Sequence, residues 1–167
     1  MIEITKWVHS IAGVFHLVTA VVGLLTGVYL LLTAKGTKLH KSIGYVFSGA
    51  LVTVNVSALF IYDFNDGKPS VFHYLIIISM FCLLYGLYPM FKKPAIRGRI
   101  KQHFKGMIGA ALGLWAAGAT EYFVRELSHG LNAAQLITYS FVISVPFVIL
   151  IGWIIWYYVH RTKWGRL

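Results

Sequence analysis

Five long apolar segments alternate with short polar ones along the chain. They cover approximately residues 7–33, 39–62, 71–91, 103–124 and 136–160. Each is comparable to or longer than the roughly 20 helical residues that cross the hydrocarbon layer of a bilayer. The pattern predicts an all-α integral membrane protein with five transmembrane helices in a single membrane domain, and it leaves no segment for a separate soluble domain.

The composition agrees with this class of protein. Hydrophobic residues make up 58% of the chain and charged residues 12%, and the mean hydropathy is +0.73, outside the range of soluble globular proteins. The formal net charge is +10. Because anionic lipid headgroups attract the basic loops of membrane proteins, this charge requires no nucleic-acid partner, and the lipid bilayer is the expected partner.

The basic residues show how the chain is expected to cross the membrane. They are concentrated in the first and third loops, as Lys35, Lys38 and Lys41 and as Lys92, Lys93, Arg97, Arg99, Lys101 and Lys105. The second loop contains Asp63, Asp66 and a single Lys68. Since short cytoplasmic loops carry the positive excess, we predict a multi-pass protein of the cell (inner) membrane with its N-terminus outside and its C-terminus in the cytoplasm.

Four histidines recur at nearly constant spacing near the starts of the first four apolar segments. They are His9, His40, His73 and His103, separated by 31, 33 and 30 residues. If the helices alternate in direction, the first and third histidines lie near the outer face and the second and fourth near the inner face. Two pairs of imidazoles at the two membrane faces are the arrangement that holds two b-type haems, so the pattern predicts a transmembrane electron-transfer cytochrome.

The histidine spacing also indicates an internal repeat. The first and third histidines are 64 residues apart and the second and fourth 63 apart, with Lys38 and Lys101 each two residues before an inner histidine. We therefore predict two repeated helical hairpins, residues 1–63 and 64–127, followed by an additional helix and basic tail in 128–167. In such a four-helix bundle the first helix faces the third across the centre, and the second faces the fourth.

The outer ligand has two candidates on the first helix. His16 follows His9 by seven residues, so it lies on nearly the same helical face and about 10 Å deeper. Either residue can pair with His73, and if His16 is the ligand, His9 is free to bind a propionate or the substrate. At the inner face, Lys38 and Lys101 are expected to neutralise haem propionates.

Glu121 is the acidic residue expected inside the outer leaflet, because it lies about 27 Å along its helix from His103. It could accept protons beside an outer haem or pair with His16. It could also pair with Arg125 through their i, i+4 spacing, which is the more ordinary interpretation.

Cysteine usage limits the kind of redox cofactor. Cys82 is the only cysteine, and a single thiol supports neither an iron–sulfur cluster nor covalent c-type haem attachment. A redox cofactor must then be held by histidine or without covalent bonds.

Glycines near the histidines have two interpretations. Gly13 and Gly44 each follow a histidine by four residues, which leaves space one turn away for the edge of a porphyrin. Two further pairs, Gly23 with Gly27 and Gly109 with Gly113, have the small-xxx-small spacing of closely packed membrane helices. Helix packing is the favoured interpretation of the glycines taken alone.

Two stretches of sequence carry a resemblance to a known family. Residues 34–40 (Ala-Lys-Gly-Thr-Lys-Leu-His) and 70–73 (Ser-Val-Phe-His) resemble the starts of the second and third core helices of the two-haem cytochromes of the b-561 type. The resemblance covers approximately residues 5–124. It implies four core helices that carry the axial histidines. In the electron-transfer hypothesis, a quinol or small reductant is the electron donor and a further molecule is the acceptor. The chain also resembles an uncharacterised bacterial family of membrane proteins, which implies no activity.

A non-redox function is the alternative. The protein could be a small transporter, an accessory subunit of a larger membrane complex, or a metal-binding protein. A divalent ion could use His9, His16, His73 and Glu121, because imidazole and carboxylate suit zinc or iron. The fifth helix could contact a membrane partner.

Overall fold

The computed structural model describes residues 7–8, 10–62, 70–94 and 97–161, and all regular secondary structure in these ranges is helical. The elements are α1 (Ile11–Leu32), α2 (Lys38–Ala58), α3 (Val71–Phe91), α4 (Arg99–Tyr122), a π-helical turn (Phe123–Leu127) and α5 (Ala133–Arg161). All five predicted segments form helices, and their ends lie within four residues of the predicted ends. The predicted all-helical fold is confirmed.

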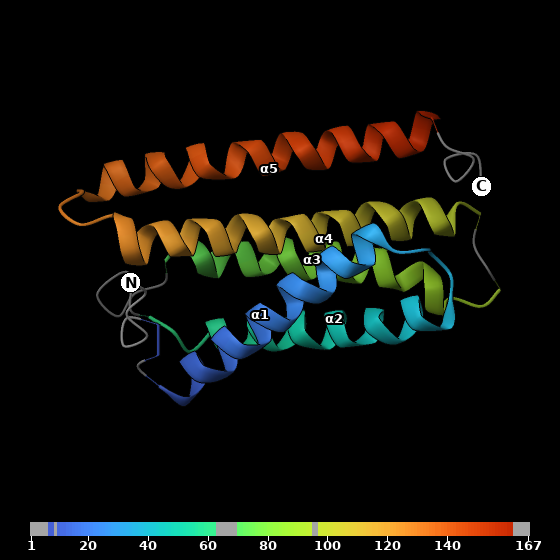
Figure 1. Ribbon diagram of the computed structural model, residues 1–167, viewed down its shortest axis with the longest axis horizontal. Helices are drawn as coiled ribbons and strands as arrows, with labels where there is room; N and C mark the ends of the chain where they lie inside the picture. Colours follow the sequence, from blue (N-terminus) through green and yellow to red (C-terminus); the bar gives the residue numbers. More distant parts are fainter. Residues whose placement is uncertain (1–6, 9, 63–69, 95–96, 162–167) are drawn as a thin grey trace.

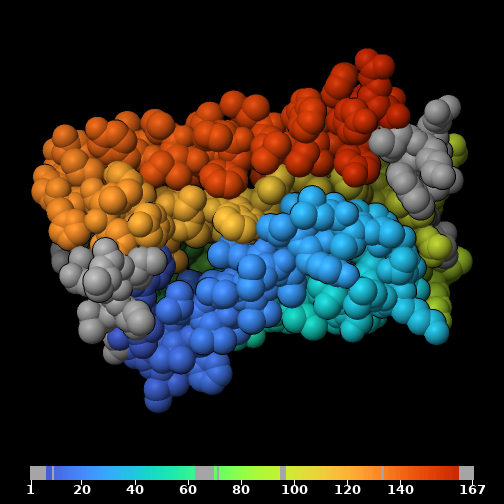
Figure 2. Space-filling view, in the orientation of Figure 1, coloured from blue at the N-terminus to red at the C-terminus, as the bar shows by residue number. Residues whose placement is uncertain are grey.

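The first four helices form a bundle in which consecutive helices run antiparallel (Figure 1). α1 packs against α2 and α4, and α3 packs against the same two helices. The diagonals of the bundle are therefore α1 with α3 and α2 with α4, as the sequence predicted. α5 lies outside this bundle along α4 (Figure 1), and in the space-filling view it forms an outer ridge above α4 and α1 (Figure 2).

The outer surface of the helices is apolar. Within the described residues, α1, α3, α4 and α5 are long and apolar enough to cross a membrane. α2 has 21 residues and runs beside α1 and α3 over the same length of the bundle (Figure 1). On α5 the side chains of Phe141, Val148 and Ile149 are 64–67% exposed. Large apolar side chains exposed along whole helices are suited to contact with lipid.

Small residues bring the helices together in the core. A Cβ atom on Gly23 would lie 2.8 Å from Leu114 Cδ2, and one on Gly27 would lie 3.2 Å from Phe47 Cε2. The packing interpretation is therefore confirmed for this pair. A Cβ on Gly44 would meet nothing within 4 Å, so its predicted role beside a porphyrin stays a prediction.

The first loop is held by hydrogen bonds that fix where α2 begins. The Thr37 hydroxyl accepts a hydrogen bond of 3.0 Å from the backbone N–H of His40, which places His40 in the first turn of α2. The Lys35 ammonium donates to the carbonyl oxygens of Leu30, Leu31 and Thr33 at the end of α1. Burial lowers the pKa of Lys35 from its ordinary value, because it disfavours the charged ammonium. The three carbonyl acceptors offset the cost of burying this charge.

Candidate functional site

The predicted inner histidines meet across the bundle. His40 on α2 and His103 on α4 have ring centroids 6.4 Å apart and ring planes at 82°. The two helices are diagonal in the bundle, so the rings face each other through its interior. They lie at the end that carries the basic first and third loops, which we call the basic end.

The nitrogens of these two rings differ in their partners. His103 Nδ1 lies 2.8 Å from the carbonyl oxygen of Gly86 on α3. A carbonyl only accepts, so Nδ1 carries the proton and the neutral ring keeps its lone pair on Nε2, the tautomer of a metal-ligating histidine. His40 Nδ1 is buried and has no hydrogen-bond partner among the described residues. Because buried polar atoms are nearly always paired, this nitrogen marks a place where a bound group is expected.

Lys38 and Lys101 lie at the same end of the bundle. Each precedes one of the two facing histidines by two residues, in the first turn of α2 or α4. Lys38 is exposed and Lys101 is half-buried. Their interaction with haem propionates stays a prediction.

At the opposite end, His16 is held between two helices. Its Nδ1 lies 3.2 Å from the Val54 carbonyl oxygen and 3.2 Å from Ser57 Oγ, both on α2. Its Nε2 lies 3.5 Å from Glu121 Oε2 on α4. The ring can therefore bridge α2 and α4, and the predicted pairing of His16 with Glu121 is confirmed.

Glu121 also forms the ordinary ion pair. Its Oε1 accepts a 2.9 Å hydrogen bond from Nε of Arg125. The Arg125 guanidinium lies 5.2 Å from the centre of the Trp7 ring, and Trp7 Nε1 donates a 2.8 Å hydrogen bond to Glu126. The π-helical turn that carries Arg125 and Glu126 thus ties Trp7 to the end of α4.

His73 has a structural role that the sequence analysis did not anticipate. Its Nδ1 accepts a 3.1 Å hydrogen bond from the backbone N–H of Ser70. This bond is part of a capping box at the start of α3. The Tyr62 ring lies 4.7 Å away, centroid to centroid. Because a backbone N–H only donates, Nδ1 holds the lone pair and Nε2 of the neutral ring carries the proton. That Nε2 is buried without a partner in the described part of the chain.

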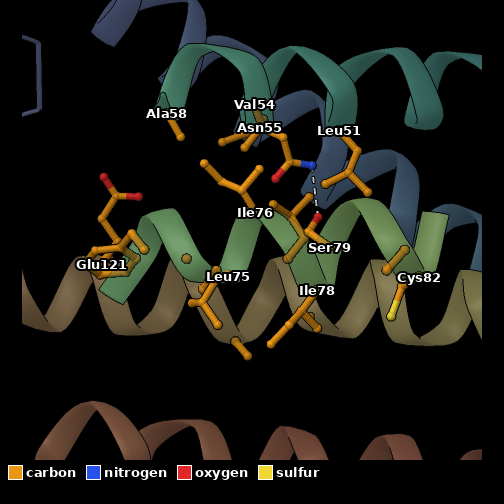
Figure 3. A pocket seen from close by; sticks show the side chains of 18 of the residues that line it. Leu51, Val54, Asn55, Ala58, Leu75, Ile76, Ile78, Ser79, Cys82 and Glu121 are labelled. Atoms are coloured by element: carbon orange, nitrogen blue, oxygen red, sulfur yellow. Dashed lines mark hydrogen bonds between the residues drawn. The ribbon is translucent and has the colours of Figure 1, made fainter. Parts of the chain in front are cut away.

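A cavity of about 380 Å³ lies within the bundle at this end, and residues of all five helices line it. His16, His73 and Glu121 are among them, and most of the other lining side chains are apolar. Figure 3 shows Glu121 at one side of this cavity and, across the middle, the 3.0 Å hydrogen bond from Asn55 Nδ2 to Ser79 Oγ. We call this space the His73 cavity.

Some predicted ligands are not tested by this geometry. His9 lies outside the described residues, so the structure places only His16 of the two outer candidates. Among the described residues, no three His, Cys, Asp or Glu side chains come together as they would around a metal ion. The spacing of Ser70 and His73, cap residue and third helical residue, was the sequence signal for the hydrogen bond that the analysis missed.

The family model described as "Predicted membrane protein (DUF2306)" matches residues 13–160. The chain belongs to this family. No curated protein and no solved structure matches the chain. Membership of DUF2306 confirms the resemblance to a family of membrane proteins without assigned activity, and together with the apolar helices it identifies a multi-pass membrane protein. The resemblance to cytochromes of the b-561 type stays a prediction.

Proposed function

We propose that this DUF2306 protein is a membrane electron-transfer protein that holds a b-type haem between His40 and His103. The observation that carries the proposal is the 6.4 Å separation of the two ring centroids. An imidazole nitrogen binds a transition metal at about 2 Å, so two rings that share one metal atom have centroids about 6 Å apart. The two rings already stand at this separation.

The polar environment of the pair supports the same proposal. Gly86 orients the His103 ring and leaves Nε2 free to bind iron, while His40 has a buried nitrogen without a partner among the described residues. Iron held by two histidines has no open coordination position, so a haem in this site would transfer electrons rather than bind oxygen. The lysines at the basic end suit the negative propionates of a haem.

The outer pair supports a haem less well. To bind iron through Nε2, neutral His73 must move its proton to Nδ1, which already accepts the Ser70 N–H. His16 has both ring nitrogens near other groups, at 3.2 Å from the Val54 carbonyl oxygen and 3.5 Å from Glu121. The outer haem stays a prediction, and the number of haems per chain tests it.

The proposal is tested by the ultraviolet–visible spectrum of the detergent-purified protein, oxidised and then reduced with dithionite, with haem quantified per chain. We expect a sharp reduced α-band, lost in His40→Ala and in His103→Ala. His160→Ala is the matched control, because His160 is exposed near the end of α5. A colourless protein after haem-replete expression would refute the proposal, and so would full haem content in both His40→Ala and His103→Ala. A colourless protein would favour the non-redox alternative of a transporter, metal site or accessory subunit.

A further inference from the structure

The His73 cavity combines a few polar groups with walls that are mostly apolar. We propose that it binds a lipid-soluble quinone. This inference deepens the function proposed above, since the quinone would be the redox partner of the protein, but the binding itself requires no haem.

His73 supplies a hydrogen-bond donor for a quinone carbonyl. Its Nδ1 is occupied by the Ser70 N–H, so the proton of the neutral ring is on Nε2, which is buried and has no partner in the described part of the chain. His73 is one of the residues that line the cavity. An N–H donor cannot ligate a metal ion, but it can bond to a carbonyl oxygen. A buried donor without a partner is unfavourable, so a carbonyl that accepts this hydrogen bond gains affinity.

His16 and Glu121 supply the second polar contact. Their facing atoms, Nε2 and Oε2, are 3.5 Å apart, which is longer than the usual 2.7–3.2 Å hydrogen bond. Both atoms therefore retain capacity to bond to a ligand oxygen. Because the Val54 carbonyl accepts a hydrogen bond from His16 Nδ1, Nε2 of the neutral ring is an acceptor, as is Glu121 Oε2. The oxygens of a quinone accept hydrogen bonds when oxidised and donate them when reduced. The His73 N–H therefore suits a quinone carbonyl, and the pair of His16 and Glu121 suits the hydroxyl of the reduced form.

The walls and the opening suit the rest of a quinone. The volume of about 380 Å³ is in the range of small-molecule sites, about 300–1,000 Å³. Two lining residues, Ile78 on α3 and Val148 on α5, are 59% and 64% exposed. The cavity thus reaches the apolar outer surface, where an isoprenoid tail can remain in the lipid.

Glycine positions provide a matched pair of variants. Gly113 lines the cavity, and a Cβ placed on it would meet nothing within 4 Å, so a larger side chain there enters the open space. Gly49 on α2 is exposed, and its Cβ would also meet nothing within 4 Å. Leucine at Gly113 fills the cavity, whereas leucine at Gly49 adds the same group outside it.

The experiment measures equilibrium binding of ubiquinone-1 to the full chain in nanodiscs, with empty nanodiscs as the blank. We expect one saturable site per chain, lost in Gly113→Leu and unchanged in Gly49→Leu. His73→Leu should bind about tenfold more weakly, the effect of one lost hydrogen bond. His73→Gln, which can place a donor N–H near the position of Nε2, should bind within about threefold of the wild type.

The outcomes separate this proposal from the proposed function. No saturable binding above the blank, or equal binding by Gly113→Leu, overturns the quinone site. If Gly113→Leu does not fold, as judged by circular dichroism and size exclusion, the comparison of His73→Leu with His73→Gln decides, and equal affinities overturn the proposal. Two haems per chain, one of them lost in His73→Leu, also overturn it. A colourless protein that binds quinone refutes only the haem, and a red protein that binds none refutes only the quinone site.

Discussion

At the scale of single residues, His103 and His73 differ in the backbone group that contacts the ring nitrogen Nδ1. The Gly86 carbonyl accepts a hydrogen bond from the N–H at His103 Nδ1, whereas the Ser70 N–H donates one to the lone pair of His73 Nδ1. The first bond leaves Nε2 as a lone pair and the second leaves it as an N–H donor. The same residue type therefore offers a lone pair on Nε2 at one end of the bundle and an N–H donor on Nε2 at the other.

The pair of Glu121 and Arg125 gives a prediction at this scale. Their side chains are 15% and 5% exposed, and removing one member of a buried ion pair leaves an uncompensated charge. We expect Glu121→Leu and Arg125→Leu each to lower the free energy of unfolding by about 3 kcal/mol, measured by SDS titration in mixed micelles. The double variant should lose clearly less than the sum of the two.

The control for this prediction is Lys38→Leu, which removes an exposed charge and should change the unfolding free energy by less than about 0.5 kcal/mol. Additive losses in the double variant would show that the carboxylate and the guanidinium do not stabilise each other.

At the scale of helices, hydropathy was sufficient to predict where each element lies. The apolar runs gave all five helices, and the alternation of direction gave the diagonals that bring His40 to His103. Hydrogen bonds between side chain and backbone could not be predicted in the same way, because they depend on ring rotation and on which carbonyl faces the ring. The bonds of His103 to Gly86 and of His16 to Val54 are of this kind, since each joins residues far apart in the sequence.

The crossing of α3 and α4 gives a prediction for a helix contact. A Cβ on Gly106 would overlap backbone atoms of Gly86 and would lie 2.6 Å from the Cys82 carbonyl oxygen. Backbone cannot give way as a flexible side chain can, so Gly106→Ala should force the helices apart. We expect a loss of about 3 kcal/mol in the free energy of unfolding, the upper end of the usual cost of overpacking.

Gly49→Ala is the matched control for this contact, because the added methyl group meets nothing within 4 Å. It should be neutral or slightly stabilising, since alanine is favoured over glycine within a helix by about 1 kcal/mol. Equal unfolding free energies for the two variants would mean that α3 and α4 do not approach each other at Gly106.

At the scale of the whole molecule, the two ends of the bundle differ in chemistry. The basic end holds the facing pair of His40 and His103, and the other end holds the His73 cavity with Glu121. α5 lies outside the bundle (Figure 2), and large apolar side chains along its length are exposed. Its predicted contact with a membrane partner stays a prediction, as does the internal repeat of the two hairpins.

The orientation of the molecule is tested by single-cysteine labelling, for which Cys82 is first replaced by serine because it is the only cysteine. Lys38→Cys marks the basic end and His129→Cys the opposite end, and both positions are exposed. Since basic loops remain in the cytoplasm, an impermeant maleimide should label His129→Cys in intact cells and Lys38→Cys only after permeabilisation. The control Lys93→Cys, also exposed at the basic end, should behave like Lys38→Cys.

The reverse labelling pattern, or equal labelling of both ends in intact cells, would contradict this orientation. The result also bears on the proposed electron transfer, because Lys38 lies two residues from His40. If Lys38→Cys is protected in intact cells, the inner histidine pair faces the cytoplasm. A quinone in the His73 cavity would then lie toward the outer leaflet, and the two proposed sites would stand on opposite sides of the membrane.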